Sequence, residues 1–270
     1  MCALTQASTI VTDGLVSYWT LDRGHTDKKK IKDVWADNDA TIHGNPSFVN
    51  GHFQDALEFN GKDDYISLSN LPNFRFQLRA STFEAWIKVR KNDKGGYLFF
   101  IQEDCTLWYI SISRVLNNEA EDAIGYGIRF GEKGNEDGCI GTQSGLFSPT
   151  LFDRKWHHIV YTNQISPLNP HAFDDTLHSR IFIDGSLILD EKRFSADGSI
   201  FNPFKSDISL GAQINGESKD FFEGDIDEVR IYDRALSEKE VTQNYESDRG
   251  LVVKPMDKLS TVWGSLKMNN

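Results

Sequence analysis

Short strand-forming segments recur along most of the chain, with turn residues between them. They are rich in β-branched and aromatic side chains, and Gly, Asn or Asp stands at most of their ends. No helical periodicity separates them, so the sequence lacks the crossover helices of a β-α-β fold. It therefore predicts an all-β protein built as an antiparallel two-sheet sandwich. The main predicted strands are residues 15–21, 56–59, 65–68, 81–89, 97–101, 107–114, 124–130, 156–162, 180–190, 207–212 and 225–233.

Two local patterns support individual strands of this sandwich. The stretch 81–89 alternates four apolar side chains with other residues, which is the pattern of a strand with one face in the core. The stretch 180–190 reads as two strands joined at Asp184-Gly185. This dipeptide accepts the positive φ angles of a two-residue hairpin turn, so these strands should be direct neighbours.

One short helix is predicted, over residues 238–245. Ser237 and Glu240 have the spacing of a capping box, in which each side chain binds the backbone N–H of the other residue. Leu236 and Val241 have the spacing of the hydrophobic staple that accompanies such a box. The helix should therefore follow the last strand directly.

The composition is that of a folded domain, and it excludes some partners. Hydrophobic residues make up 39% of the chain and aromatic residues 12%, which is ample for a packed core. The 40 acidic and 29 basic residues give a net charge of −11, whereas nucleic acids and anionic membranes require a basic surface. No apolar run approaches the roughly 18 residues of a membrane span. We expect no nucleic-acid partner and no membrane insertion, and an Asp-rich surface suits Ca²⁺.

Three segments are expected along the chain. Residues 1–13 are too short for a complete signal peptide and are interpreted as the remnant of a leader. Residues 14–246 should form the sandwich, and residues 247–270 lose periodicity and are interpreted as a tail. Cys105 and Cys139 could form a disulfide in an exported protein or remain reduced thiols, and the sequence leaves this open. The module is expected to be monomeric.

Acidic residues are concentrated in the last predicted strand. Glu223, Asp225 and Asp227 recur at every second position, so in a regular strand they share one face. Val229 and Ile231 continue that face and are expected in the core. A carboxylate in line with core side chains is costly unless it is neutralised or hydrogen-bonded. The stretch therefore indicates a metal ion, a catalytic group or a hydrogen-bond network.

Seven segments, in this order, resemble the LamG-like jelly-roll family of the concanavalin A-like lectin/glucanase superfamily. No single motif is specific, but the order extends over about residues 14–246. The resemblance implies a jelly-roll β-sandwich of two curved sheets. It also implies a non-catalytic module, secreted or at the cell surface, that binds a glycan or a cell-surface protein, often with Ca²⁺. The segments are GLVSYWTLD (14–22), ALEFNGKDDYI (56–66), STFEAWIK (81–88), WHHIVYT (156–162), IFIDGSLI (181–188), ISLGA (208–212) and GDIDEVRIYDRALSEKEV (224–241).

The resemblance and the acidic residues together predict a structural calcium site. The first and last strands of this family are neighbours, which would bring Asp22 close to Asp227. Asn60, Asp63 and Asp64 lie in a turn that could add oxygen ligands, and Ca²⁺ takes six to eight oxygens. Two facing carboxylates without a cation would repel each other and raise a pKa. The alternative is that the turn residues only cap the turn and Asp227 accepts backbone hydrogen bonds.

A glycoside hydrolase or polysaccharide lyase is the alternative of another class. Glucanases of the superfamily resemble Glu-x-Asp-x-x-Glu, which Glu223, Asp225 and Glu228 match. Retaining glycosidases hold their two carboxyl groups about 5–5.5 Å apart. However, this strand matches the closing strand of the family, which we expect at the edge of the sandwich and not under a sugar cleft. No catalytic residue is therefore assigned.

Trp108 and Tyr126 are the predicted ligand-binding residues. Sugars stack their C–H faces on exposed aromatic rings. The resemblance implies that the strands carrying these two residues line the concave sheet. The alternative is that both rings belong to the core. A purely structural domain for protein–protein adhesion is the third possible function.

Overall fold

The structure of the protein is a computed structural model. Cys105 and Cys139 lie outside the residues that it describes. The described residues are 9–68, 80–90, 96–103, 106–116, 119–130, 140–147, 149–166, 175–195, 208–214 and 218–247.

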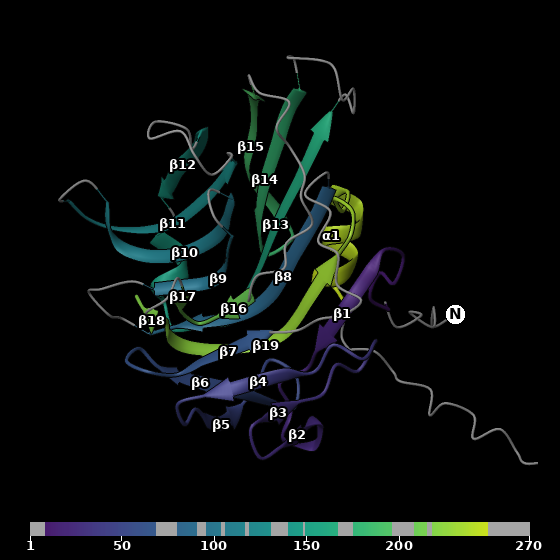
Figure 1. Cartoon of the computed structure of the whole chain (residues 1–270), viewed down its shortest axis with the longest axis vertical. Coiled ribbons are helices and arrows are strands. Elements are labelled where there is room, and N and C mark those ends of the chain that lie inside the picture. Colours follow the sequence, from purple (N-terminus) through teal and green to yellow (C-terminus); the bar gives the residue numbers. More distant parts are fainter. Residues whose placement is uncertain are drawn as a thin grey trace, which may run out of the picture.

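Two antiparallel sheets form the body of the described part of the protein, as the sequence predicts (Figure 1). The order in the first, here called sheet A, is β15-β14-β13-β8-β19-β6-β5, with β1 also paired to β19. Its strands are β1 (Leu15–Trp19), β5 (Ser47–Asn50), β6 (Asp55–Asn60), β8 (Ala80–Val89), β13 (His157–Ser166), β14 (Asp175–Ile183), β15 (Ser186–Ser195) and β19 (Glu223–Tyr232).

The second sheet, here called sheet B, has the order β12-β11-β10-β9-β16-β7-β4-β3-β2. Its strands are β2 (Thr26–Asp27), β3 (Lys30–Ile31), β4 (Ala40–His43), β7 (Tyr65–Leu68), β9 (Gly96–Glu103), β10 (Thr106–Leu116), β11 (Glu119–Phe130), β12 (Ile140–Phe147) and β16 (Ile208–Leu210). The remaining described elements are the ribbon of β17 (Gln213–Ile214) and β18 (Ser218–Lys219), the 3-10 helices η1 (Arg23–His25) and η2 (Pro149–Phe152), and α1 (Glu238–Tyr245).

The main core fills the space between the two sheets. Strand β8 contributes Phe83, Ala85, Ile87 and Val89, which are at most 3% exposed and belong to one apolar cluster. These are the four alternating apolar residues of the predicted strand, so the inward face of β8 is confirmed. The Asp184-Gly185 turn is confirmed as well, since both residues have positive φ and β14 pairs directly with β15.

Strand β19 lies in the middle of sheet A, between β8 on one side and β6 and β1 on the other. The expectation that this strand lies at the edge of the sandwich is therefore wrong. A strand that closes the chain need not close the sheet, because long-range pairing and not chain order decides which strands are neighbours. The pairing of β1 with β19 confirms that the first and last long strands lie side by side.

A β-bulge at Glu228 changes which way the residues of β19 face. Glu228 has φ +53, and the register between β19 and β8 shifts at this point. One extra residue in a strand reverses the alternation beyond it. Ile226, Val229 and Ile231 accordingly all lie in the main core. The expectation that Asp227 shares a face with Val229 and Ile231 is therefore wrong.

A second apolar layer covers the outer face of sheet A, where α1 lies (Figure 1). Val160 of β13 belongs to this layer, whereas its neighbours Ile159 and Tyr161 belong to the main core, as alternation in a strand requires. Helix α1 spans the predicted residues and has the predicted capping box at Ser237. The buried residues of this layer are Ile10, Val11, Leu15, Tyr18, Val160, Phe182, Tyr232, Leu236 and Val241.

The folded part extends slightly beyond the expected domain limits. Ile10 and Val11, in the segment interpreted as a leader remnant, are 3% and 7% exposed. Ser247 is 3% exposed, and its hydroxyl donates to the backbone oxygen of Asn244. Residues 1–8 and 248–270 lie outside the described part of the chain.

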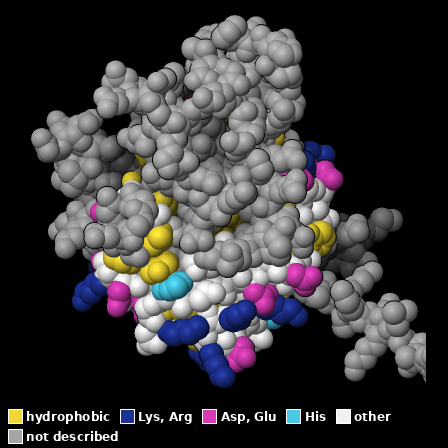
Figure 2. Space-filling view, in the orientation of Figure 1, with side chains coloured by type: hydrophobic (Ala, Val, Ile, Leu, Met, Phe, Trp, Pro, Cys, Tyr) yellow, Lys and Arg dark blue, Asp and Glu magenta, His cyan; other side chains and the backbone are white. Residues whose placement is uncertain are grey.

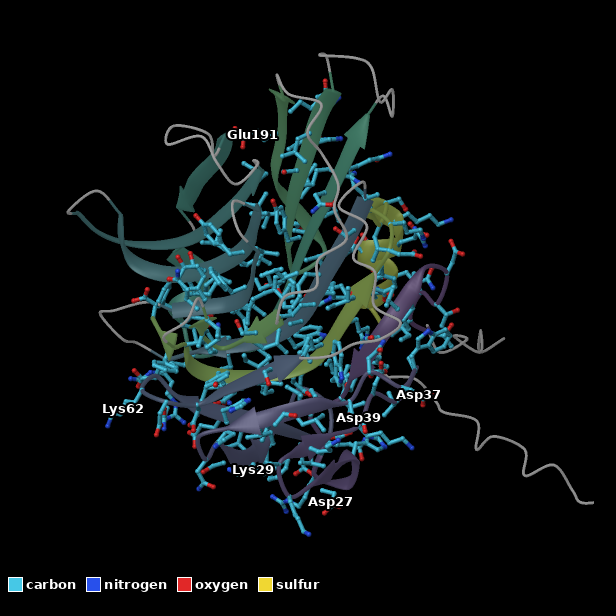
Figure 3. The ribbon with its side chains drawn as sticks, in the orientation of Figure 1. Asp27, Lys29, Asp37, Asp39, Lys62 and Glu191 are labelled. Carbon is cyan, nitrogen blue, oxygen red and sulfur yellow. The ribbon has the colours of Figure 1, made fainter. Side chains whose placement is uncertain are left out.

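Charged side chains of both signs are interspersed on the described part of the face in Figure 2. Asp27, Lys29, Asp37 and Lys62 are exposed, and in Figure 3 they lie at the periphery of the fold. Such mixing does not create the large single-sign field that attracts a polyanion. No helix in the described residues is long and apolar enough to cross a membrane.

Candidate metal centre and buried polar network

Asp22 and Asp227 face a single loop, residues 51–55. Asp22 is 4% exposed, and its Oδ1 accepts from the backbone N–H of Asp55 at 3.0 Å. Its Oδ2 accepts from Nε2 of Gln54 at 3.2 Å. Asp227 is 0% exposed, and its Oδ2 accepts from the backbone N–H of Phe53 at 3.0 Å. The structure therefore brings the two predicted carboxylates to the same place, here called the seam.

A negative charge on Asp227 would be unfavourable at the seam. Its Oδ1 is buried and has no hydrogen-bond partner among the described residues. Burial, together with repulsion from Glu228 and then Asp22, raises the pKa of Asp227 to about 9. A proton or a bound cation would remove this penalty, because either one neutralises the carboxylate.

Oxygen atoms converge beside Gly51 at the seam. A Cβ added to Gly51 would lie 2.6 Å from Oδ2 of Asp227 and 2.4 Å and 2.6 Å from the backbone oxygens of Phe53 and Asp55. One carboxylate and two carbonyl oxygens therefore approach the same small space. Carboxylates and carbonyls are the ligands that Ca²⁺ takes, so these three oxygens are of the type that suits this ion.

Asn60, Asp63 and Asp64 lie at the far end of β6 from the seam. The five strand steps from Asp55 to Asn60 separate the two places by roughly 16 Å. Oδ1 of Asn60 accepts from the backbone N–H of Lys62 and Asp63, and the carboxylate of Asp64 accepts from the backbone N–H of Asn60. These are the contacts expected if the three residues only cap the turn.

The five predicted metal ligands thus do not form one site. The turn residues are separated from the seam because they follow the opposite end of the same strand. No group of three or more His, Cys, Asp or Glu side chains among the described residues could hold a metal ion. Calcium at the seam stays a prediction, and Asp22 and Asp227 are the carboxylates that would bind it.

Replacing Gly51 with alanine should destabilise the protein by about 1–3 kcal/mol, because the new methyl group would overlap three oxygens. It should also weaken any effect of calcium on the melting temperature. The matched control is Gly24→Ala, since nothing lies within 4 Å of a Cβ there. Urea denaturation of both variants, with and without calcium, measures the difference. Equal stability of the two variants would contradict the close packing at the seam.

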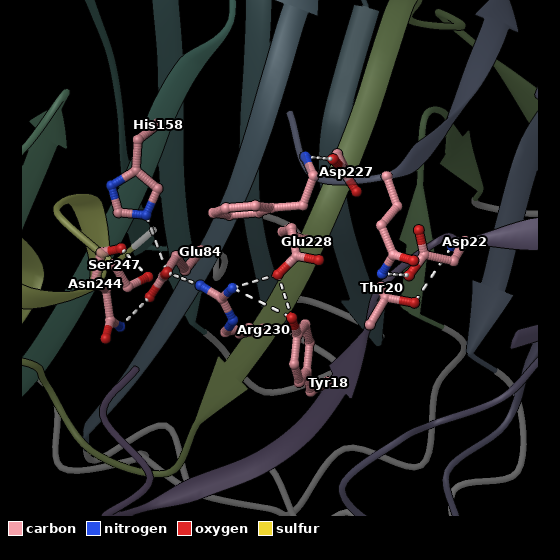
Figure 4. Close-up of polar contacts among 12 residues, drawn as sticks. Tyr18, Thr20, Asp22, Glu84, His158, Asp227, Glu228, Arg230, Asn244 and Ser247 are labelled. Atoms are coloured by element: carbon pink, nitrogen blue, oxygen red, sulfur yellow. Dashed lines mark hydrogen bonds and ion pairs between the residues drawn. The ribbon is translucent and has the colours of Figure 1, made fainter. Parts of the chain in front are cut away.

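A network of charged side chains is buried on the outer face of sheet A (Figure 4). Arg230 lies at its centre. Nη1 of Arg230 donates to Oε1 of Glu84 at 2.5 Å, and its Nη2 donates to Oε2 of Glu228 at 2.5 Å. The Tyr18 hydroxyl donates to the same Glu228 oxygen, and Nε2 of His158 lies 2.9 Å from Glu84. All five residues are at most 2% exposed.

The charge on Arg230 acts differently on its two carboxylate partners. Burial alone would raise the pKa of Glu84, but attraction to Arg230 and His158 outweighs it and lowers the pKa to about 2. Burial dominates at Glu228 and raises its pKa despite Arg230. Glu84 is therefore the counter-ion of Arg230, and removing the arginine would leave it with only His158 and Asn244 as side-chain partners.

The same network attaches the outer layer to sheet A. Asn244 of α1 donates through Nδ2 to Oε2 of Glu84 at 2.7 Å, and its Oδ1 accepts from the backbone N–H of Val11 at 2.7 Å. The Tyr232 hydroxyl donates to the backbone oxygen of Val11 at 3.1 Å. The helix and the N-terminal segment are thus both held to β8 and β19 by polar contacts.

Sequence reasoning did not find this network. The available signal was Glu84, a lone acid within the apolar stretch 81–89. Its partner Arg230 is 146 residues away in the chain. A buried acid requires a partner, but the sequence alone does not tell which of the 29 Lys and Arg residues supplies it.

A family model described as the concanavalin A-like lectin/glucanases superfamily matches residues 60–242. This match includes more than half of the 270 residues. The chain belongs to this superfamily. The match confirms the resemblance seen in the strand order, and the two antiparallel sheets of the structure agree with it. A search of curated protein sequences finds no significant match.

Solved structures with a similar fold include binding domains of botulinum neurotoxins. The receptor binding domain of botulinum neurotoxin C/D mosaic serotype is 16% identical, with a TM-score of 0.63 over 88% of this chain and 52% of that one. The binding domain of botulinum neurotoxin DC in complex with rat synaptotagmin II is 15% identical, with a TM-score of 0.58 over 87% and 52%. This chain thus spans about half the length of the neurotoxin fragments.

A third similar structure matches over its full length. Domain 4 of AbnA, an extracellular GH43 arabinanase from Geobacillus stearothermophilus, was solved in complex with arabinotriose. It is 16% identical to this chain, with a TM-score of 0.57 over 89% of this chain and 100% of that domain. At this identity the likeness shows the superfamily fold alone.

The predicted ligand-binding residues lie on neighbouring strands of sheet B. Trp108 in β10 pairs with Ile128 in β11, and Tyr126 in β11 pairs with Ile110 in β10. The side chains of Trp108 and Tyr126 lie outside the described part of the structure, so their role in binding stays a prediction. The two residues therefore lie on neighbouring strands of the same sheet.

The three acids of the glucanase pattern do not meet at one site. Glu228 is 2% exposed and is hydrogen-bonded to Tyr18 and Arg230 beneath the outer layer. Glu223 and Asp225 lie earlier in β19 and border a pocket that does not include Glu228. A catalytic pair needs both carboxyl groups at the scissile bond. Glu228 is not placed to reach a substrate.

Proposed function

We propose that the protein is a non-catalytic, extracellular carbohydrate-binding module whose scaffold is braced by calcium at the seam. The observation that carries the proposal is the superfamily fold, which this chain shares with the whole of a domain solved with arabinotriose. Binding domains of this shape use a rigid sandwich to hold loops and sheet faces in place for a ligand.

The geometry of the acids supports binding over catalysis. The third acid of the hydrolase pattern is sequestered with Arg230, which leaves the pattern incomplete. A binding module needs no proton transfer, so it tolerates this arrangement. We therefore assign no catalytic residue.

The proposed role of calcium is structural. Asp22 and Asp227 would hold the ion together with carbonyl oxygens of the loop 51–55, joining the first strand, the last strand and this loop. The bound ion would supply positive charge to two buried carboxylates. A scaffold fixed in this way loses less conformational entropy when it binds a ligand.

A protein receptor is the second candidate ligand. The neurotoxin binding domain that was solved with synaptotagmin shares the fold. The present chain would then serve as an adhesion module, and the role of the calcium brace would be the same.

A glycan array probed with the purified protein, followed by calorimetric titration with arabinotriose, tests the proposal. We expect binding of at least one sugar, and a melting temperature that rises on adding calcium and falls on adding EDTA, because an ion that binds only the native state stabilises it. Asp227→Asn should abolish the calcium effect, whereas Asp37→Asn, at an exposed site, should retain it.

Three results would contradict the proposal. Failure to bind any glycan, with retained binding to a cell-surface protein, would favour the adhesion function. Sustained release of reducing sugar that is lost in Glu223→Gln would establish a hydrolase. A melting temperature unaffected by calcium and EDTA would contradict the proposed structural calcium site at the seam.

A further inference from the structure

A pocket of about 500 Å³ lies at the end of sheet A where β8 finishes and β19 begins. Sites for small organic ligands have volumes of roughly 300–1,000 Å³, so the pocket is large enough for one. Its polar lining carries charges of both signs. The lining residues used below are Lys88, Arg90, Arg154, Glu223, Asp225 and Val49.

Asp225 provides an unused hydrogen-bond acceptor at this pocket. The residue is 2% exposed, and its Oδ2 forms an ion pair with Nζ of Lys88 at 2.5 Å. Its Oδ1 makes no hydrogen bond with any described residue. Nη2 of Arg90 lies 3.9 Å from Oδ1, which is too far for a hydrogen bond. A buried acceptor in this state gains free energy if a ligand donates to it.

Arg154 provides unused donors at the same pocket. It is exposed, and among the described residues it makes no side-chain hydrogen bond or ion pair. Its turn is held in place by His157, whose ring lies 3.0 Å from Oδ1 of Asp153 and 2.8 Å from Oδ2 of Asp184. Arg154 itself has φ +65, an uncommon conformation for a residue with a side chain. The backbone is thus fixed while the guanidinium is available.

The balance of charges selects the class of ligand. Glu223 and Asp225 would repel an anion, and Arg154 would repel a cation. A neutral hydroxyl group avoids both penalties, since it donates one hydrogen bond and accepts others. A hydroxyl group beside Asp225 and Arg90 can donate to the carboxylate and accept from the guanidinium, which also pairs with Glu58. Val49 adds apolar surface suited to the C–H groups of a sugar ring.

We propose that this pocket binds a neutral saccharide through Asp225, Arg90 and Arg154. The inference rests on the proposed carbohydrate-binding function and gives it a site on sheet A, apart from Trp108 and Tyr126 on sheet B.

Calorimetric titration of the wild type and of three variants tests the proposal. The probes are arabinotriose, maltotriose and cellotriose as neutral sugars and trigalacturonate as an anionic one. We expect a neutral sugar to bind, and Arg154→Ala to raise its Kd about tenfold or more, because a charge-assisted hydrogen bond is lost. Lys155→Ala is the matched control: it removes the same charge from the same turn outside the pocket, and should leave Kd within about twofold.

Asp225→Asn should weaken binding to a similar degree, and a melting curve checks that it folds. If Asp225→Asn does not fold, Arg154→Ala still tests the pocket, because Arg154 is exposed and its replacement should leave the fold intact. If a neutral sugar binds and Arg154→Ala has wild-type affinity, the pocket is the wrong site while the carbohydrate-binding function stands. Stronger binding of trigalacturonate than of any neutral sugar would overturn the ligand class. If neither the probes nor the glycan array shows binding, the proposed function fails and the pocket with it.

Discussion

Replacing Arg230 with methionine is expected to lower the free energy of unfolding by about 3–5 kcal/mol. The change would leave Glu84 and Glu228, at 0% and 2% exposure, buried without the guanidinium that both contact. An unpaired buried charge costs more than the contact itself contributes, because the carboxylate has lost its water. Urea denaturation followed by tryptophan fluorescence measures the loss.

Arg90→Met is the control for this prediction. Arg90 also pairs with an acid, Glu58, but its side chain is 46% exposed, so its removal should cost at most about 1 kcal/mol. In the double variant Arg230→Met and Glu84→Leu, part of the stability should return, since no charge is then stranded at Glu84. If Arg230→Met costs no more than Arg90→Met, the network does not hold the outer layer.

The calcium-free protein is expected to lose stability as pH rises from about 4 to about 9. The pKa of Asp227 is about 9 in the folded state, against about 3.9 for an unfolded aspartate. Between these values the folded state binds a proton that the unfolded state releases, so rising pH favours unfolding. One such group gives a slope of at most about 1.4 kcal/mol per pH unit. Glu228, whose pKa is also raised, acts in the same direction.

Urea denaturation at several pH values in EDTA measures this slope. Saturating calcium should flatten it, because the ion neutralises Asp227 in place of the proton. Asp227→Asn should flatten it without calcium, since an amide does not titrate, and the exposed control Asp37→Asn should not. An unchanged slope in Asp227→Asn would show that its carboxyl group is not the source.

Features of the fold that depend on neighbouring residues follow from the sequence. The Asp184-Gly185 turn, the capping box of Ser237 and Glu240, and the buried face of 81–89 are all present in the structure. Each depends on backbone geometry or side-chain alternation within a few residues, so local propensity is enough to decide it.

The candidate site was predictable only in part. The proximity of Asp22 and Asp227 followed from the neighbouring strands that the family resemblance implies. The sequence also predicts metal ligands in the turn formed by Asn60, Asp63 and Asp64, but the length of β6 separates this turn from the seam. The sequence predicts this strand over 56–59, but only long-range contacts show that Asp22 and Asp227 lie at its beginning, away from the turn.

The sequence by itself determined the class of this protein: an acidic chain of alternating strands, short turns and one capped helix. The tertiary structure decided what its acidic residues do. The bulge at Glu228 turns Asp227 away from the core, and Tyr18, 210 residues away, meets Glu228 beside Arg230. The physical reason is that a buried charged side chain has lost its contact with water and must be paired or hydrogen-bonded inside the protein. Only long-range strand pairing brings that partner within reach.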